Sequence, residues 1–190
     1  MIKLQLRKIY LSTQKSLSDQ EKDEKSLQIE KLFFDKFDLS KVNLLHLFIS
    51  IAKNSEVETV GFFEKIWRVY PDIKTIVPRV DFRMDLLTHH VYNAEIELET
   101  NRWGIAEPKL ENFVDEKNVD LVLVPLLCFD EQGFRVGYGK GFYDKFLSLC
   151  RPDCLKIGLS FFPPVEKIED TDKFDVNLDY CITPDEIYSF

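Results

Sequence analysis

Hydrophobic residues alternate along the chain between two patterns, and together these patterns predict an α/β fold. Short continuous apolar runs at residues 42–51, 74–78, 121–125, 155–161 and 180–183 are typical of strands buried on both faces of a sheet. The stretches between them place apolar residues three or four apart, as amphipathic helices do. We therefore predict three layers: a mainly parallel, twisted sheet with helices on both of its faces.

Four helices are predicted between these strands. Residues 2–15 form a short amphipathic basic helix, and Ser18 with Glu21 forms a capping box that opens a second helix. The residues expected to point inward from this second helix are Leu27, Leu32, Phe33, Phe34 and Phe37. An N-cap pattern at residues 55–58 opens a third helix, and residues 142–150 form a fourth. The third helix is expected to carry one apolar stripe of Val60, Phe63, Trp67 and Tyr70.

The remaining segments are expected to lie at the surface. Apolar and polar residues alternate within residues 86–99, which predicts one or two exposed strands. Residues 103–108 are expected to form a loop, and residues 163–175, proline-containing and acidic, a surface connection. Without a repeat or linker, residues 1–190 are interpreted as a single domain.

Charge and cysteine content narrow the classes of function. The net charge of −8 argues against a nucleic-acid-binding protein, which normally has a basic face. No apolar run is long enough to span a membrane. The four cysteines (Cys128, Cys150, Cys154 and Cys181) lack the spacing of a zinc site and predict free thiols in a reducing compartment. We expect a cytoplasmic monomer that acts on a small molecule.

One glycine-rich segment, residues 135–144, carries the clearest chemical signal. Three glycines alternate with other residues between a predicted strand and a predicted helix, and Arg135 and Lys140 add positive charge. Such a loop can point backbone N–H groups at an anion, and glycine lets the ligand come close. The spacing fits neither a Rossmann fingerprint nor a Walker loop, because Phe142 and Gly141 occupy the deciding positions. The segment is a candidate phosphate site, although many similar loops bind nothing.

Six short motifs occur in order along nearly the whole chain, and together they point to one protein family. The first four are Lys3 with Leu6 and Arg7; Ser50 with residues 56–59; residues 77–80; and Trp103, Gly104, Ile105, Glu107 and Pro108. The most specific match contains Pro125, Phe129, Asp130, Gly133, Arg135, Gly137, Gly139, Gly141, Tyr143 and Asp144. The sixth motif is Asp175, Asp179, Ile182 and Thr183. Together these motifs resemble the 5-formyltetrahydrofolate cyclo-ligase family, also called methenyltetrahydrofolate synthetases.

The resemblance implies a carbon–nitrogen ligase that uses ATP and Mg²⁺ to close 5-formyltetrahydrofolate to 5,10-methenyltetrahydrofolate. ADP and phosphate would be released. Phosphorylation of the formyl oxygen would activate the formyl carbon for attack by N10. The implied fold is similar to the sugar-phosphate isomerase and CoA-transferase scaffold, which agrees with the three-layer prediction.

The resemblance also implies roles for particular residues. Those expected to bind ATP are Lys3, Arg7, Arg135, Gly137, Tyr138, Gly139, Lys140, Gly141 and Asp144. Those expected to bind the folate are Glu56, Trp103 and Tyr143. Lys140, Arg135 and Tyr143 are the expected catalytic residues, and Asp144 and Asp179 the expected magnesium ligands.

Each of these residues also has an ordinary structural interpretation. Lys3 and Arg7 could form a solvated helix face, and an acid such as Asp144 is favoured in the first turn of any helix. Glu107 could be a loop acid without a role, and His46, within an apolar strand, is interpreted as a core residue. Phe142 and Tyr138 are departures, because many family members have tyrosine at the first position and some a basic residue at the second.

Two other functions are compatible with the sequence. One is a non-catalytic protein of the same fold that binds ATP or folate as a sensor. The other is an isomerase or transferase on a similar scaffold that needs no nucleotide, since a fold alone does not fix a function.

Overall fold

The computed structural model describes residues 1–101, 104–109 and 112–190, and its centre is a seven-stranded sheet. In spatial order the strands are β11 (Ile187–Ser189), β10 (Tyr180–Ile182), β9 (Leu155–Leu159), β6 (Leu121–Pro125), β1 (Leu44–His46), β2 (Lys74–Asp81) and β3 (Leu86–Val91). The five inner strands are parallel, and the edge strands β11 and β3 run antiparallel to their neighbours. This arrangement confirms the predicted mainly parallel sheet of a single α/β domain.

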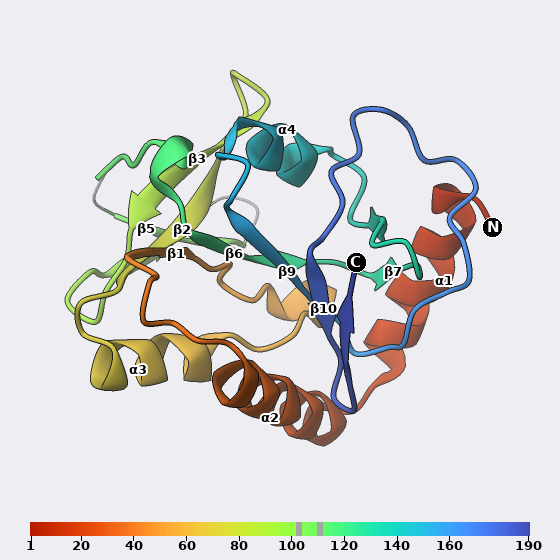
Figure 1. Cartoon of the computed structure of the whole chain (residues 1–190), viewed down its shortest axis with the longest axis horizontal. Helices are drawn as coiled ribbons and strands as arrows, with labels where there is room; N and C mark the ends of the chain where they lie inside the picture. Colours follow the sequence, from red (N-terminus) through yellow and green to blue (C-terminus); the bar gives the residue numbers. More distant parts are fainter. Residues whose placement is uncertain (102–103, 110–111) are drawn as a thin grey trace.

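In the described part of the chain, four α-helices surround the sheet (Figure 1). They are α1 (Lys3–Ser16), α2 (Asp19–Lys36), α3 (Val60–Val69) and α4 (Phe142–Leu149). α2 and α3 lie on one face of the sheet, α4 lies on the other, and α1 lies at the side beside β7 (Cys128–Phe129). The predicted capping box at the start of α2 is confirmed, because Ser18 and Glu21 cap each other's backbone N–H.

Alternation along the strands divides the core between the two faces. On β6, Leu121 and Leu123 pack with the aromatic side chains of α2 and α3, whereas Val122 and Val124 pack with α4. All four side chains are almost completely buried. The continuous apolar runs of the sequence therefore reflect strands that have no solvent-facing side.

Two predicted elements differ from the structure. The apolar run at residues 42–51 forms a strand only at Leu44–His46, and the chain then leaves the sheet. α3 begins at Val60 with Thr59 at its N-cap, not at residues 55–58, because the chain first makes a 3-10 turn at Ala52–Asn54. α3 buries Phe62, Phe63 and Ile66 almost completely, and the predicted Trp67 and Tyr70 pack against the core while remaining partly exposed. Val60 and, on α2, Leu27, both expected inside, are exposed.

The strands predicted within residues 86–99 are confirmed, whereas several other short strands carry no clear sequence signal. Residues 86–99 divide into β3 and the start of β4 (Leu98–Thr100), which pairs with β5 (Ala106–Pro108) inside the predicted loop. β7 pairs with β8 (Arg135–Val136) in a hairpin that leads into the glycine loop, and α1 packs Leu6 against this hairpin. These pairs are set by tertiary contacts, because two or three residues are too few for a period-two pattern to be visible.

Two packed histidines, His46 on β1 and His89 on β3, predict how stability depends on pH. His89 packs against His46 and Phe146, and burial lowers the pKa of His89 from 6.5 to about 4. The unfolded chain therefore binds a proton in this window that the folded chain does not, so stability is lost as the pH falls from 6.5 towards 4. We expect His89 alone to lower the free energy of unfolding by about 3 kcal/mol over this range.

Urea unfolding at a series of pH values measures this effect, with His89→Asn as the comparison. The free energy of unfolding of the variant should decrease less than that of the wild type between pH 6.5 and 4. An equal decrease in the two proteins would contradict the prediction that His89 causes this loss of stability.

Candidate active site

A cavity of about 420 Å³ lies at the carboxyl ends of β1 and β6 and beside the glycine loop. In parallel α/β sheets, ligands bind at this edge. Apolar side chains form much of its wall: Phe48, Ile49, Ile51, Pro78, Val80, Leu87, Ile105 and Pro125. The predicted site residues that line it are Lys3, Arg7, Glu56, Arg135, Gly137, Tyr138, Gly139, Lys140, Gly141, Tyr143 and Asp144. We call it the central cavity.

The glycine loop depends on backbone conformations that glycine adopts readily. Gly139 and Gly141 have φ values of +92° and +68°, and Gly141 is the N-cap of α4. A Cβ at Gly139 would lie 3.0 Å from the guanidinium carbon of Arg7. Glycine at this position therefore allows α1 to pack its arginine directly against the loop.

Four cations converge on this loop, and three of them are held by the protein. Arg7 donates from Nε to the Gly137 carbonyl (2.9 Å), and Lys3 Nζ donates to Asp175 Oδ1 (2.6 Å). Arg135 Nη2 donates to Asp144 Oδ1 (2.8 Å). The exposed Lys140 has no hydrogen bond or ion pair with another described residue. Its ammonium group is therefore available to a ligand.

Arg135 holds its position through burial and two neighbouring acids. The Arg135 side chain is only 5% exposed and also donates to the Val176 carbonyl. Burial lowers the pKa of the guanidinium, and the charges of Asp144 and Asp175 oppose that shift. The pair with Asp144 therefore fixes a positive charge at the cavity wall.

The two predicted magnesium ligands are not brought together. Asp144 lines the central cavity, whereas Asp179 lies at the amino end of β10 and accepts from Lys156 N (2.7 Å) and Nζ (2.8 Å). Asp175, four residues earlier, lines the cavity instead. Among the described residues no group of three or more His, Cys, Asp or Glu side chains could enclose a metal ion. Two carboxylates facing a phosphate site are nevertheless the donor set that Mg²⁺ commonly uses.

Glu56 is a buried carboxylate held at the cavity wall. It accepts from the Ile51 N–H (2.9 Å) and from Asn54 Nδ2 (3.1 Å), and Asn54 is tied to α1 because its carbonyl accepts from Gln14. Burial raises the pKa of Glu56, and these hydrogen bonds partly oppose the shift. The side chain is thus preorganised to accept further N–H donors.

Three polar atoms of the cavity wall have no hydrogen-bond partner among the described residues. They are the hydroxyls of Tyr138 and Tyr143 and Oε1 of Glu107. Burial, followed by the Glu56 charge, raises the pKa of both tyrosines. Buried polar atoms normally have partners, so these three atoms indicate that the cavity receives a polar ligand.

Three residues that line the cavity were not predicted from the sequence, and one predicted site residue lies outside the described residues. Asp175, Asn54 and Glu107 line the cavity without having been assigned a role. Trp103, expected to bind the folate, lies outside the described residues. His46 is fully buried in β1, as expected of a core residue.

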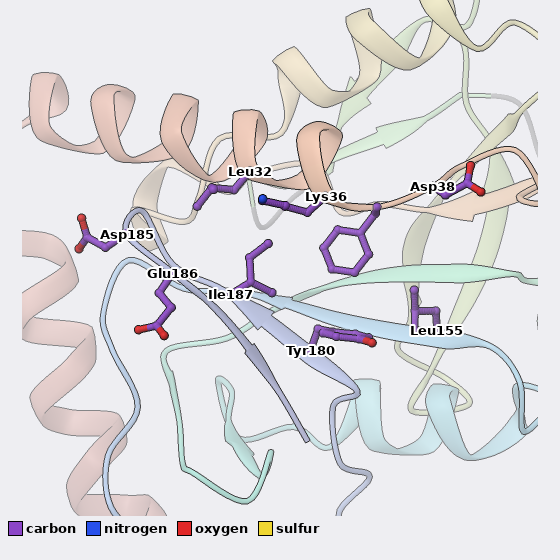
Figure 2. Close-up of a pocket in the computed structure, with 9 residues that line it drawn as sticks. Leu32, Lys36, Asp38, Leu155, Tyr180, Asp185, Glu186 and Ile187 are labelled. Carbon is purple, nitrogen blue, oxygen red and sulfur yellow. The ribbon is translucent and has the colours of Figure 1, made fainter.

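A larger and more open groove of about 640 Å³ lies at the amino ends of β9 and β10 (Figure 2). It is lined by Leu32, Lys36, Phe37, Asp38, Leu155, Tyr180, Asp185, Glu186 and Ile187. Three of its four charged residues are acidic, and it has no glycine loop. The central cavity is therefore the stronger candidate for an anionic ligand.

Comparison with known proteins identifies the family of this chain. Residues 2–184 match the model of the 5-formyltetrahydrofolate cyclo-ligase family. The chain belongs to this family. A probable 5-formyltetrahydrofolate cyclo-ligase of Schizosaccharomyces pombe is 28% identical, over 97% of this chain and 96% of its own.

Solved structures of methenyltetrahydrofolate synthetases have the same fold. The Aquifex aeolicus protein superposes with a TM-score of 0.83 at 26% identity, covering 100% of this chain and 93% of its own. The Mycoplasma pneumoniae protein gives 0.78 at 25% identity, covering 97% and 99%. Both agree with the α/β fold described above, and the chain is a member of a ligase family. No helix in the described part of the chain is long and apolar enough to cross a membrane.

Proposed function

We propose that this protein is an ATP- and Mg²⁺-dependent ligase that closes 5-formyltetrahydrofolate to 5,10-methenyltetrahydrofolate. The observation that carries the proposal is that one cavity joins a cationic glycine loop to an apolar wall with a buried carboxylate. The first part suits a triphosphate and the second suits a flat ring with N–H donors. Membership of the cyclo-ligase family supports the pairing of these two ligands.

The reaction requires that the formyl oxygen be converted into a good leaving group. A formamide carbonyl is a weak electrophile, so transfer of the γ-phosphoryl group to the formyl oxygen first creates a leaving group. N10 then attacks the formyl carbon, the C–O bond breaks, and phosphate leaves while N10 loses its proton. The protein has to hold the formyl oxygen in line with the phosphate and to stabilise the developing charge.

The cations of the cavity fit this task. Lys140, which has no partner among the described residues, would contact the transferred phosphoryl group, and Arg135, fixed by Asp144, would neutralise charge beside it. Lys3, Arg7 and the loop from Gly137 to Gly141, including Tyr138 and Gly139, would bind the rest of the triphosphate.

The acids of the cavity fit a magnesium ion. Asp144 and Asp175 would hold it, because both line the cavity, and Asp179 is not included because it does not line the cavity. When bound, Mg²⁺ would offset the negative charge of the phosphates.

The folate would occupy the apolar part of the cavity. Glu56 would accept N–H donors of the pteridine, and Tyr143 would pack beside the ring and offer its hydroxyl. The role of Trp103 rests on the sequence motif. Free thiols at all four cysteines support a cytoplasmic location.

Release of ADP tests the proposal. We expect the purified protein with Mg²⁺ to release ADP when ATP and 5-formyltetrahydrofolate are both present, and far more slowly when the folate is omitted. ADP release that does not depend on the folate would contradict the ligase. ATP binding without any ADP release would instead favour a sensor.

A further inference from the structure

Glu107 occupies the middle of β5 and lines the central cavity, yet the chemistry above gives it no role. Its side chain is 5% exposed, so it is almost completely removed from solvent. Oε2 lies 3.3 Å from Arg79 Nε on β2, which balances the charge. Oε1 is buried and has no hydrogen-bond partner among the described residues.

A buried carboxylate oxygen without a donor is unfavourable. The ion pair with Arg79 stabilises one side of the carboxylate and leaves the other open to the cavity. A ligand N–H placed at Oε1 would remove this unfavourable state. The arrangement is therefore that of a preorganised acceptor.

The chemistry around Glu107 restricts which part of the ligands can lie there. The phosphate oxygens of ATP and the carboxylates of the folate's glutamate tail accept hydrogen bonds and cannot donate one to Oε1. The nearby apolar lining, which includes Pro78, Val80 and Ile105, suits a flat uncharged ring. The reduced pteridine is such a ring and carries N–H groups on its edge.

We propose that Glu107 Oε1 accepts a hydrogen bond from N8–H of the reduced pteridine. The inference rests on the proposed function. If Glu56 takes the 2-amino group and N3–H, formylation of N5 leaves N8–H as the remaining N–H donor of the ring. The oxidised ring has no hydrogen at N8. Glu107 thus acts as a specificity residue that distinguishes the reduced substrate from oxidised folates.

Calorimetric binding without ATP tests this role with two ligands: 5-formyltetrahydrofolate and its 8-deaza analogue, in which carbon replaces N8. Glu107→Gln should weaken binding of the natural substrate about tenfold to a hundredfold, because the glutamine amide cannot accept from both the ligand and Arg79. The 8-deaza analogue should bind the wild type and Glu107→Gln equally. ATP affinity of the same samples should be unchanged, which shows that the variant is folded.

Glu97→Gln is the matched control. Glu97 belongs to the same β4–β5 region and pairs with Lys109, but its side chain is 76% exposed and does not line the cavity. This control should bind both ligands as the wild type does. If Glu107→Gln fails to fold, Glu107→Asp keeps the charge on a shorter side chain and should show the same ligand-dependent loss.

The other outcomes distinguish a failure of the N8–H contact from a failure of the proposed function. Unchanged binding of 5-formyltetrahydrofolate by Glu107→Gln, or equal weakening of both ligands, would overturn the N8–H contact. A wild type that binds ATP but no 5-formyltetrahydrofolate would overturn the proposed function itself.

Discussion

Replacing Lys140 by alanine is expected to lower kcat about 100- to 1000-fold. Lys140 lines the central cavity and has no described protein partner, so its positive charge is available to the transferred phosphoryl group. Removing one preorganised group that stabilises developing charge has an effect of this size. Because no described protein contact is lost, the free energy of unfolding should stay within about 0.5 kcal/mol of the wild type.

ATP titrations of turnover and a thermal melt measure both parts of this prediction. Lys145→Ala is the matched control, since Lys145 lies on α4 and pairs with Asp85 at the surface. This control should retain wild-type turnover. Unchanged ATP affinity and turnover in Lys140→Ala would show that Lys140 does not act on the phosphates of ATP.

Replacing Asp144 by asparagine should have two separable effects. We expect the Mg²⁺ concentration for half-maximal activity to rise about tenfold or more, because the ion loses one of its two carboxylates. We also expect a loss of about 1–3 kcal/mol in the free energy of unfolding, because the buried Arg135 loses its charged partner. Asparagine keeps an oxygen for the Val176 N–H, so the local backbone should be retained.

Activity against Mg²⁺ concentration and urea unfolding separate the two effects. Asp85→Asn removes an exposed carboxylate that pairs with Lys145, and it should change neither quantity appreciably. An Asp144→Asn protein with wild-type Mg²⁺ dependence would show that Asp144 serves only to hold Arg135.

The sheet and the glycine loop were predictable because their signals are local. A strand buried on both faces needs apolar residues at every position, as at residues 121–125, and a loop with positive φ favours glycine. The end of β1 was not predictable, because residues 47–49 stay apolar after leaving the sheet: they line the core and the cavity. The short pairs β4–β5 and β7–β8 depend on contacts between distant segments.

The choice between Asp175 and Asp179 illustrates the limit of the site prediction. Both acids belong to one motif, and residue type gives no reason to prefer either. The route of residues 163–175 past α1 brings Asp175 to Lys3, whereas the start of β10 brings Asp179 to Lys156. Glu107 was missed for a related reason. Its oxygen without a hydrogen-bond partner results from the way the folded chain buries it, which the sequence does not show.

The absorbance of the purified protein with 5-formyltetrahydrofolate and Mg²⁺, recorded with and without ATP, tests the central claim most directly. The methenyl product has an extended conjugated chromophore that the substrate lacks. The proposed ligase predicts that the product band grows with time when ATP is present and stays absent without it. No band in the presence of ATP, from protein that binds both ligands, would contradict the proposed reaction.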